Sequence, residues 1–173
     1  LWPMLAVIAA IILLDSPGPV FFRQTRITQY GKPFRIFKFR TMREHAETSG
    51  PALTQVEDRR ITRVGRYLRK WRLDELPQLL NIIKGDMSFV GYRPERQYFI
   101  DKIMAENPDY AKLYAMRPGV FSNATLYNGY TDTMEKMLKR LDMDLEYLEH
   151  HNLWTDIVII FKTGVSILTG KKF

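Results

Sequence analysis

The chain opens on an uninterrupted apolar run, from Leu1 to Leu14, which Asp15 ends. As a helix this run covers roughly 21 Å, less than the roughly 30 Å of a bilayer's hydrocarbon core. Apolar residues surround the helix on every side, although a buried core helix is the alternative. We predict that residues 1–15 form a re-entrant, membrane-embedded helix that enters and leaves on one face. Pro3 would supply its bend, and more apolar sequence is expected upstream.

Two further segments have the pattern of short strands. They run from Val20 to Thr28 and from Phe34 to Arg40, and a turn-rich stretch over 29–33 joins them. This spacing predicts a small β-hairpin. Neither face of the second strand is purely polar. This indicates a position near a surface that has uses for both polar and apolar side chains. Residues 44–57 are polar and indicate a loop.

Most of the remaining chain has helical patterns, separated by Gly, Pro and Asn. Helices are predicted over 61–71, 74–83, 95–106, 108–116, 132–149 and 153–168. The fold class is therefore mixed α/β and mostly helical, with residues 16–173 as one domain. The last helix is mostly apolar, with Trp154 near one end. It suits an amphipathic helix in the headgroup region, and a packed core helix fits equally well.

Charge and composition narrow the choice of partner. Lys and Arg number 26 against 19 Asp and Glu, which gives a formal charge of +7. Such a balance favours an anionic partner: nucleic acid, a phosphorylated molecule or an acidic membrane surface. The chain has no cysteine, which excludes disulfides, a thiolate nucleophile and Cys-ligated metals. Its three histidines are too few and too clustered for a His-based metal site.

The positive charge is concentrated between Arg59 and Arg72, where seven basic residues occur with no acidic one. Four of them fall at helical spacing and share one face: Arg59, Arg63, Arg66 and Lys70. A solvated basic face is the simplest interpretation. The alternatives are contact with anionic lipid or with a phosphate-bearing ligand.

Two adjacent carboxylates, Asp74 and Glu75, follow the basic run directly. Asp74 is placed to cap the predicted helix 74–83, and both acids could simply complement the helix dipole. Their setting supports a chemical role as well. Neighbouring arginines depress a carboxylate pKa, so one acid could attack phosphorus while the other holds Mg²⁺ against a diphosphate.

Four motifs in order resemble those of the bacterial sugar transferases, the monotopic phosphoglycosyl transferases. The motifs are Ser16-Pro-Gly-Pro-Val-Phe-Phe22-Arg-Gln, Phe34-x-x-x-Lys38-Phe-Arg-Thr-Met42, Leu73-Asp-Glu-Leu-Pro-Gln78 and Asn81-x-x-Lys84-Gly-Asp-Met-Ser-Phe-Val-Gly91. The resemblance implies transfer of a sugar-1-phosphate from a UDP-sugar to undecaprenyl phosphate, with release of UMP. It implies a monotopic enzyme on the cytoplasmic face of the bacterial inner membrane, against anionic phospholipid, that starts surface glycan assembly.

The resemblance also implies roles for single residues. Asp74 matches the nucleophile that forms an aspartyl–phosphosugar intermediate, and Glu75 matches its partner, which binds Mg²⁺. Family residues near the phosphates match Lys38, Arg69 and Arg93, and an active-site acid matches Asp144. From the residues alone, Asp144 would be interpreted as part of a solvated helix face.

Two departures from the family pattern stand out. Tyr92-Arg93-Pro94 replaces the usual Pro-Arg-Pro, and the stretch 121–130 replaces the common Gly-x-x-Gln-Val-x-Gly-Arg run. We expect the contacts of this second stretch, and the sugar specificity with them, to differ. The competing hypothesis is a non-enzymatic protein that binds a membrane surface or nucleic acid through its basic helix; under the enzyme hypothesis no nucleic acid is involved. The apolar last helix could serve lipid or a second subunit in a homodimer.

Overall fold

The structure is a computed structural model that describes residues 2–44, 46, 50–55, 58–129 and 131–169. Its elements in chain order are α1 (Trp2–Asp15), β1 (Phe21–Ile27), η1 (Gln29–Gly31), β2 (Pro33–Phe39), α2 (Arg63–Lys70), η2 (Leu73–Gln78), α3 (Leu79–Ile83), β3 (Ser88–Val90), α4 (Gln97–Glu106), η3 (Pro108–Ala115), β4 (Gly119–Phe121), α5 (Asn123–Asn128), α6 (Met134–His150) and α7 (Leu153–Leu168), where η marks a 3-10 helix. The mixed, mostly helical class is confirmed.

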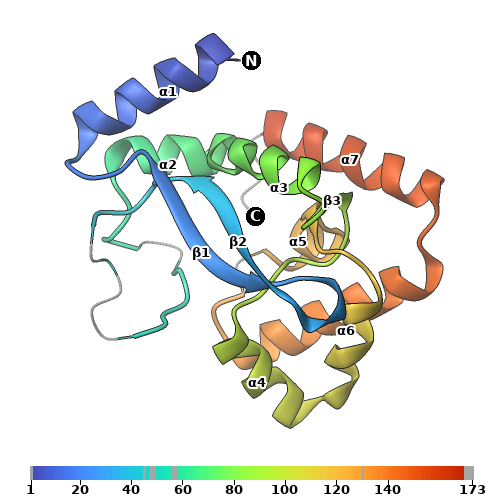
Figure 1. Ribbon diagram of the computed structural model, residues 1–173. Coiled ribbons are helices and arrows are strands. Elements are labelled where there is room, and N and C mark those ends of the chain that lie inside the picture. The colour runs from blue at the N-terminus through green and yellow to red at the C-terminus, as the bar shows by residue number, and fades with distance from the viewer. Residues whose placement is uncertain (1, 45, 47–49, 56–57, 130, 170–173) are drawn as a thin grey trace.

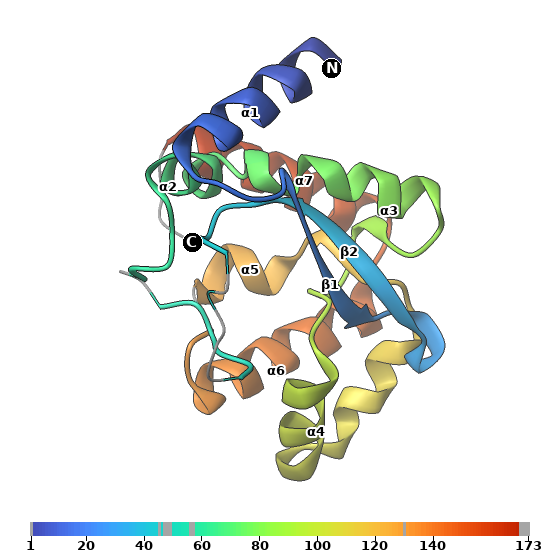
Figure 2. The ribbon, with the colours of Figure 1, turned by 60° about the vertical axis from the view of Figure 1, so that its left-hand side comes forward.

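The helices form an upper and a lower group (Figure 1). Helices α1, α2, α3 and α7 lie along the top of the molecule, and α4 and α6 lie below them. The hairpin of β1 and β2 runs between the two groups, as the turned view also shows (Figure 2). Helix α5 lies between α7 and α6 and contacts both. This arrangement leaves the hairpin as one wall of the molecule's interior.

Helix α1 is fixed to the rest of the chain along one side only. Ile8 and Ile12 are buried against Phe39 of β2 and Leu68 of α2. The carboxylate of Asp15 accepts from the backbone N–H of Val64 at 3.2 Å, which satisfies a free donor in the first turn of α2. Most of the other large apolar side chains of α1 are exposed. Helix α1 is thus neither a buried core helix nor an unattached one.

Pro3 lies in the first turn of α1, so the bend that we predict there stays a prediction. The helix runs from Trp2 to Asp15, and proline in a first helical turn removes no hydrogen bond. No helix among the described residues is both long and apolar enough to cross a bilayer. Membrane insertion of 1–15 remains a prediction.

The predicted hairpin is confirmed, with antiparallel register from the pair of Phe21 with Phe39 to the pair of Ile27 with Pro33. Arg40, just after β2, donates to the carbonyls of Ser16 and Pro17 at 2.6 and 2.5 Å. These bonds hold the Ser-Pro break after α1 against the end of the hairpin. In the predicted loop 44–57, the described residues form turns and extended backbone; residues 45, 47–49 and 56–57 lie outside the described part.

Helix α2 lies unusually close to the segment after β2. A side chain at Gly65 would bring its Cβ within 2.1 Å of the carbonyl oxygen of Thr41. The same carbonyl accepts from the backbone of Thr62, whose hydroxyl in turn caps α2 by accepting from Gly65 N–H at 3.0 Å. The absence of a side chain at Gly65 therefore lets α2 meet the end of β2 directly.

The prediction that Asp74 caps the next helix is wrong. Arg72 lies between α2 and the 3-10 helix η2 in the left-handed region, with φ 51°, and η2 begins at Leu73. Asp74 is therefore already inside a helical turn, where its side chain cannot cap that turn. The predicted helix 74–83 is divided into η2 and α3, and the predicted helix 108–116 is also a 3-10 helix, η3.

Three short elements were not predicted. Strands β3 and β4 pair in parallel, with Ser88 opposite Gly119 and Val90 opposite Phe121. Gly91 and Gly119 pass too close to each other's backbone for a side chain at either position. Helix α5 follows, and the hydroxyl of Ser122 caps it. Three-residue strands and a six-residue helix carry too little periodicity to be predicted from the sequence.

The main hydrophobic core lies in the lower part of the molecule, between α4, η3 and α6. Its buried residues are Ile27, Tyr92, Phe99, Ile100, Ile103, Tyr110, Leu113, Met137 and Leu141. Tyr92 belongs to this core, so the residue that departs from the family's Pro-Arg-Pro pattern is a packing residue. This core anchors the segment after Tyr92, which carries Arg93 and Glu95.

Candidate active site

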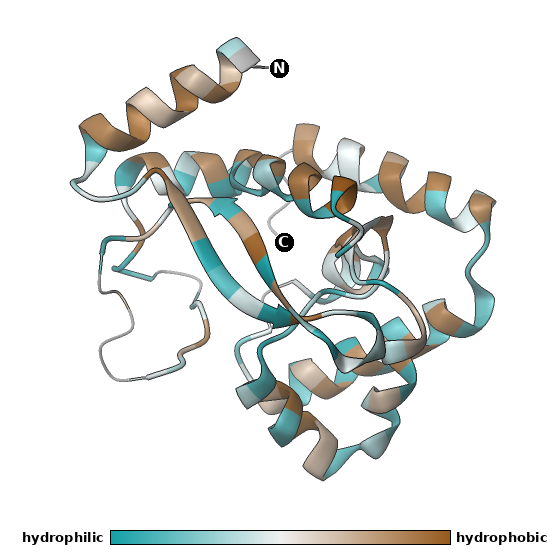
Figure 3. Ribbon diagram, viewed as in Figure 1, coloured by the Kyte–Doolittle hydropathy of each residue, from teal (hydrophilic) through white to brown (hydrophobic). Residues whose placement is uncertain are grey.

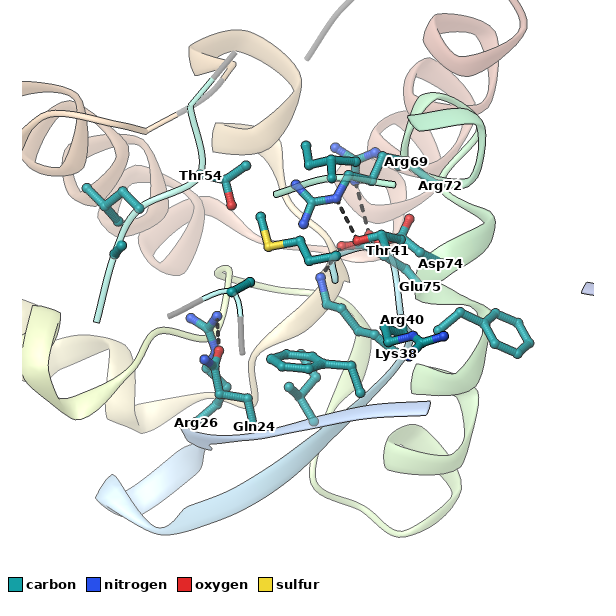
Figure 4. A pocket seen from close by; sticks show the side chains of 18 of the residues that line it. Gln24, Arg26, Lys38, Arg40, Thr41, Thr54, Arg69, Arg72, Asp74 and Glu75 are labelled. Atoms are coloured by element: carbon teal, nitrogen blue, oxygen red, sulfur yellow. Dashed lines mark hydrogen bonds and ion pairs between the residues drawn. The ribbon is translucent and has the colours of Figure 1, made fainter. Parts of the chain in front are cut away.

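A cavity of about 930 Å³ lies between the hairpin, α2, η2 and the segment that follows β3. Figure 4 shows Lys38, Asp74 and Glu75 on one side of it, and Gln24 and Arg26 across from them. The sequence-predicted residues Arg69 and Arg93 also line this cavity. Five of the six predicted site residues are therefore brought together, from four separate parts of the chain.

Glu75 lies at the centre of the positive charge. Its Oε1 accepts from Lys38 Nζ at 2.7 Å and lies 3.4 Å from both terminal nitrogens of Arg93. Arg72 Nη1 is 3.6 Å from the other carboxylate oxygen. The Glu75 side chain is only 9% exposed, so these charges are poorly screened by water. The carboxylate draws three cations to one wall of the cavity.

The two adjacent acids have opposite pKa shifts. Burial would raise the pKa of Glu75, but Lys38, Arg93 and Arg72 outweigh it and hold this pKa well below its usual range. For Asp74, burial and the charge of Glu75 raise the pKa, and Lys38, Arg69 and Arg93 oppose this only in part. The expected effect of neighbouring cations on a carboxylate pKa thus dominates at Glu75, whereas burial dominates at Asp74. The reason is that Glu75 takes the direct cation contacts.

A buried asparagine holds Glu75 and Lys38 in register. Asn81 of α3 is fully buried, and both ends of its side-chain amide form hydrogen bonds with the backbone of β2. Its Oδ1 accepts from Phe37 N–H at 3.0 Å, and its Nδ2 donates to the carbonyl of Arg35 at 2.8 Å. These bonds fix α3, and η2 before it, against the strand that carries Lys38. Asn81, the first residue of the fourth motif that resembles the family, therefore has a structural role here.

The predicted basic helix is divided in function. Arg69 faces the cavity and donates through Nε to the hydroxyl of Thr41 at 2.8 Å. Arg60 instead pairs with Asp58 outside the helix. A second, smaller hollow on the surface is lined by Arg63, Arg66, Tyr67 and Lys70. Arg66 and Lys70 also border the main cavity, so the helix divides its cations between the two hollows, and Arg63 lines only the smaller one.

Asp144 lies behind the site and does not line the cavity. It is 3% exposed on α6, and its carboxylate accepts from Ser122 Oγ at 3.2 Å and from the backbone N–H of Arg93. The interpretation as a solvated helix face is wrong, because burial and both hydrogen bonds come from tertiary neighbours. Among the residues that the structure describes, Asp144 accepts a hydrogen bond from Arg93 and lies within electrostatic reach of Arg140, and both of these arginines line the cavity.

Asp144 also gives a testable pH dependence. Burial raises its pKa from 3.8 to about 7, against Arg140 and the hydrogen bonds from Ser122 and Arg93. The folded state then holds a proton that the unfolded chain releases, so stability is full below pH 4 and declines as the pH rises to 7. Asp144→Asn stays neutral. We expect it to gain up to about 4 kcal/mol over wild type between pH 4 and pH 8, measured by chemical denaturation.

The matched control is Asp142→Asn, an exposed position on the same helix. Its free energy of unfolding should stay within about 0.5 kcal/mol of wild type. A stability difference between Asp144→Asn and wild type that does not change with pH would contradict a protonated, buried Asp144.

A second charged cluster, which the sequence analysis missed, lies at the opposite end of the cavity. Glu95 is buried and binds Arg26 of β1 at 2.6 Å and Arg140 of α6 at 2.9 Å. Burial would raise the pKa of Glu95, but Arg140 and Arg26 bring it down to about 2. We call Arg26, Glu95 and Arg140 the brace. One feature of the sequence could have indicated the brace. Gln24 and Arg26 are two positions apart in a predicted strand, which places both side chains on one face of β1.

The carboxylate oxygens of this site could coordinate Mg²⁺ only together with oxygens of a bound substrate. Among the described residues there is no group of three or more acidic, His or Cys side chains that could hold a metal. Mg²⁺ often takes one or two carboxylates and completes its shell with phosphate oxygens and water. Asp74 and Glu75 supply such a pair, beside cations suited to phosphate. His150 and His151 are exposed and do not line the cavity.

The site thus sets two adjacent acids inside a cavity lined by cations. The family model for bacterial sugar transferases matches residues 1–170, and the chain belongs to this family. It is 42% identical, over 97% of its length, to a UDP-N-acetylgalactosamine-undecaprenyl-phosphate N-acetylgalactosaminephosphotransferase of Aeromonas hydrophila. It is 45% identical over 96% of its length to a UDP-glucose:undecaprenyl-phosphate glucose-1-phosphate transferase of Caulobacter vibrioides, and 40% identical over 93% to one of Escherichia coli.

The chain spans only part of these relatives. It covers 40% of the Aeromonas protein, 63% of the Caulobacter protein and 35% of the Escherichia coli protein. The region shared with all three is the one that holds the cavity.

Proposed function

We propose that this chain transfers a sugar-1-phosphate from a UDP-sugar to undecaprenyl phosphate and releases UMP. The observation that carries the proposal is the pair of buried, adjacent acids with opposite pKa shifts, set in a cavity with Lys38, Arg69, Arg72 and Arg93. A diphosphate needs such cations, and covalent transfer needs one acid as nucleophile. The names of the relatives support the donor and acceptor.

In the first half of the reaction, a carboxylate oxygen of Asp74 attacks the phosphorus that bears the sugar. The new bond joins Asp74 to phosphorus, and the bond to the bridging oxygen of UMP breaks. Its electron pair leaves with UMP. Lys38 and Arg93 lie beside the acids and stabilise charge on the transferring phosphoryl group. Only ionised Asp74 can attack, so its raised pKa ties this step to deprotonation.

In the second half, a phosphate oxygen of undecaprenyl phosphate attacks the same phosphorus. The bond to Asp74 breaks, the carboxylate is restored, and the lipid carries the sugar through a diphosphate. Glu75 would hold Mg²⁺, which when bound neutralises phosphate charge. Glu75 must then share its oxygens with Lys38, Arg72 and Arg93, the cations that contact it.

We further propose that the upper helices lie against anionic phospholipid on the cytoplasmic face of the inner membrane. Exposed apolar side chains occur on all three of α1, α3 and α7, and Leu14, Ile83 and Leu153 are 88%, 81% and 77% exposed. Figure 3 shows these helices as the apolar upper part of the molecule. Apolar faces of this kind insert at the headgroup boundary, close to a lipid acceptor. A second copy of the chain covering α7 would be the alternative.

The test is UMP release in anionic vesicles that contain undecaprenyl phosphate and Mg²⁺. The donors are UDP-glucose, UDP-N-acetylgalactosamine and further UDP-sugars. We expect the protein to float with the vesicles and to release UMP from at least one donor, with loss of release on chelation. No release from any donor would contradict the transferase. Protein that stays in solution, as a dimer, would contradict the membrane surface and support the second copy.

A further inference from the structure

The hairpin carries one face of polar residues across the cavity. In the antiparallel register Phe22 is opposite Lys38, and two residues further along Gln24 is opposite Ile36. Directly opposed residues share a face of the sheet, so Gln24, Arg26 and Lys38 point to the same side. All three line the cavity. Along β1, Arg26 lies about 13 Å beyond the level of Lys38, at roughly 3.3 Å per residue.

The brace fixes the end of the cavity that lies around Arg26, far from Lys38, which we call the far end. Arg26 donates to Glu95 Oε1 at 2.6 Å and to the carbonyl of Pro94 at 3.3 Å, and its other terminal nitrogen donates to Gln24 Oε1 at 2.6 Å. Arg140 donates to Glu95 Oε2 at 2.9 Å and to the hydroxyl of Thr131 at 3.0 Å. Pro94 and Gln24 are thus linked to Glu95 through Arg26, and Thr131 is linked to it through Arg140.

Two observations indicate that the far end binds a ligand. The brace has two guanidinium groups and one carboxylate, so it keeps a net positive charge on the cavity wall. The Nε–H of Arg26 is buried and finds no acceptor among the residues that the structure describes. A buried donor without a partner costs free energy unless a bound group satisfies it. In Figure 4 the Arg26 side chain points into the cavity.

Reaction geometry then decides which part of a donor lies here. In phosphoryl transfer the attacking and leaving oxygens stand roughly in line on opposite sides of phosphorus. With Asp74 as nucleophile, the leaving group lies on the side of the phosphorus away from Asp74. Gln24 and Arg26 occupy the wall across the cavity from Asp74. This step rests on the function proposed above.

We infer that the brace, with Gln24, is the subsite for the leaving nucleotide, UMP. Arg26 and Gln24 contact it, and Glu95 acts as a positioning residue that holds Arg26 and Arg140 in place. As the bond between the two phosphates breaks, the electron pair passes to the UMP phosphate, whose negative charge grows. A net positive wall stabilises that charge. A neutral sugar such as glucose or N-acetylgalactosamine, which the relatives' names give, would gain nothing comparable from it.

The test measures the affinity of the detergent-solubilised protein for UMP by isothermal titration calorimetry. Arg26→Lys keeps the charge but loses the planar fork and the Nε donor. We expect its Kd for UMP to rise at least about 10-fold, the loss of one charge-assisted hydrogen bond. Gln24→Ala removes one contact and leaves the brace intact, so it decides the matter if Arg26→Lys fails to fold. Its Kd for UMP should rise about 3-fold or more.

The matched control is Arg23→Lys. Arg23 is exposed, on the same strand but the opposite face, where its guanidinium lies over Phe37. It should bind UMP as wild type does. Gln24→Ala and Arg26→Lys with unchanged Kd for UMP would overturn the inference. So would a weaker Kd for UDP-glucose with UMP affinity intact, which would assign this end to the sugar. Failure of the proposed function is distinct, because wild type would then bind neither UMP nor UDP-glucose.

Discussion

Asp74→Asn should abolish the covalent phosphosugar intermediate and lower UMP release by at least about 10³-fold. Asparagine keeps the shape of the side chain but has no carboxylate to attack phosphorus. Incubation with a UDP-sugar labelled in its sugar, followed by denaturation and mass analysis, would detect the label on wild type alone. The label should disappear when undecaprenyl phosphate is added. Because Asp74 must be ionised and its pKa is raised, labelling of wild type should also fall as the pH is lowered through that pKa.

Folding separates this result from a structural defect. Asp74 is buried and its pKa is raised, so replacing it with a neutral group should not lower the melting temperature at neutral pH. Asp101→Asn is the matched control, since Asp101 is exposed on α4 and does not line the cavity. It should label as wild type does. Labelled sugar on well-folded Asp74→Asn would remove Asp74 from the role of nucleophile.

Glu95→Gln should destabilise the fold by about 3–5 kcal/mol at neutral pH, the second large effect that we expect. The substitution leaves Arg26 and Arg140 in place without the carboxylate that both bind. Breaking a buried ion pair from one side leaves charge uncompensated in a region that water reaches poorly. The pKa of Glu95 is lowered to about 2. The loss should therefore be full above the ordinary glutamate pKa and shrink as the pH falls toward 2.

Chemical denaturation of the detergent-solubilised protein measures this loss. Glu106→Gln, at the exposed end of α4, should change stability by less than about 0.5 kcal/mol. The double substitution Glu95→Gln with Arg140→Met removes one of the two stranded cations. It should be less destabilised than the sum of its single substitutions. A fully additive double variant would contradict the brace as a coupled unit.

The local chemistry of the chain was largely predictable. The hairpin follows from alternation and a turn-rich connection, and the long helices α6 and α7 follow from periodicity. These patterns are local, because they depend on residues a few positions apart. The adjacency of Asp74 and Glu75 and the density of arginines before them are equally local. They placed an acidic pair directly after a run of cations, which made a phosphate site one of the open hypotheses.

The protonation of that pair was not predictable. Asp74 and Glu75 are neighbours with the same charge and nearly the same sequence context. What separates their pKa values is which one meets Lys38, a residue 37 positions away whose approach is set by Asn81 and the hairpin. Ion-pair geometry of this kind depends on distances across the fold, and burial multiplies its effect.

By itself, the sequence determined the fold class, the hairpin, the long helices and most of the acids and cations that line the cavity. Only the tertiary structure decided that Asp144 is buried behind Arg93, that the basic helix divides between two surfaces, and that Glu95 joins Arg26 to Arg140. These facts join residues from β1, the segment after β3 and α6, which lie up to 114 positions apart. Periodicity records which face of an element is apolar; it does not record which partner that face meets.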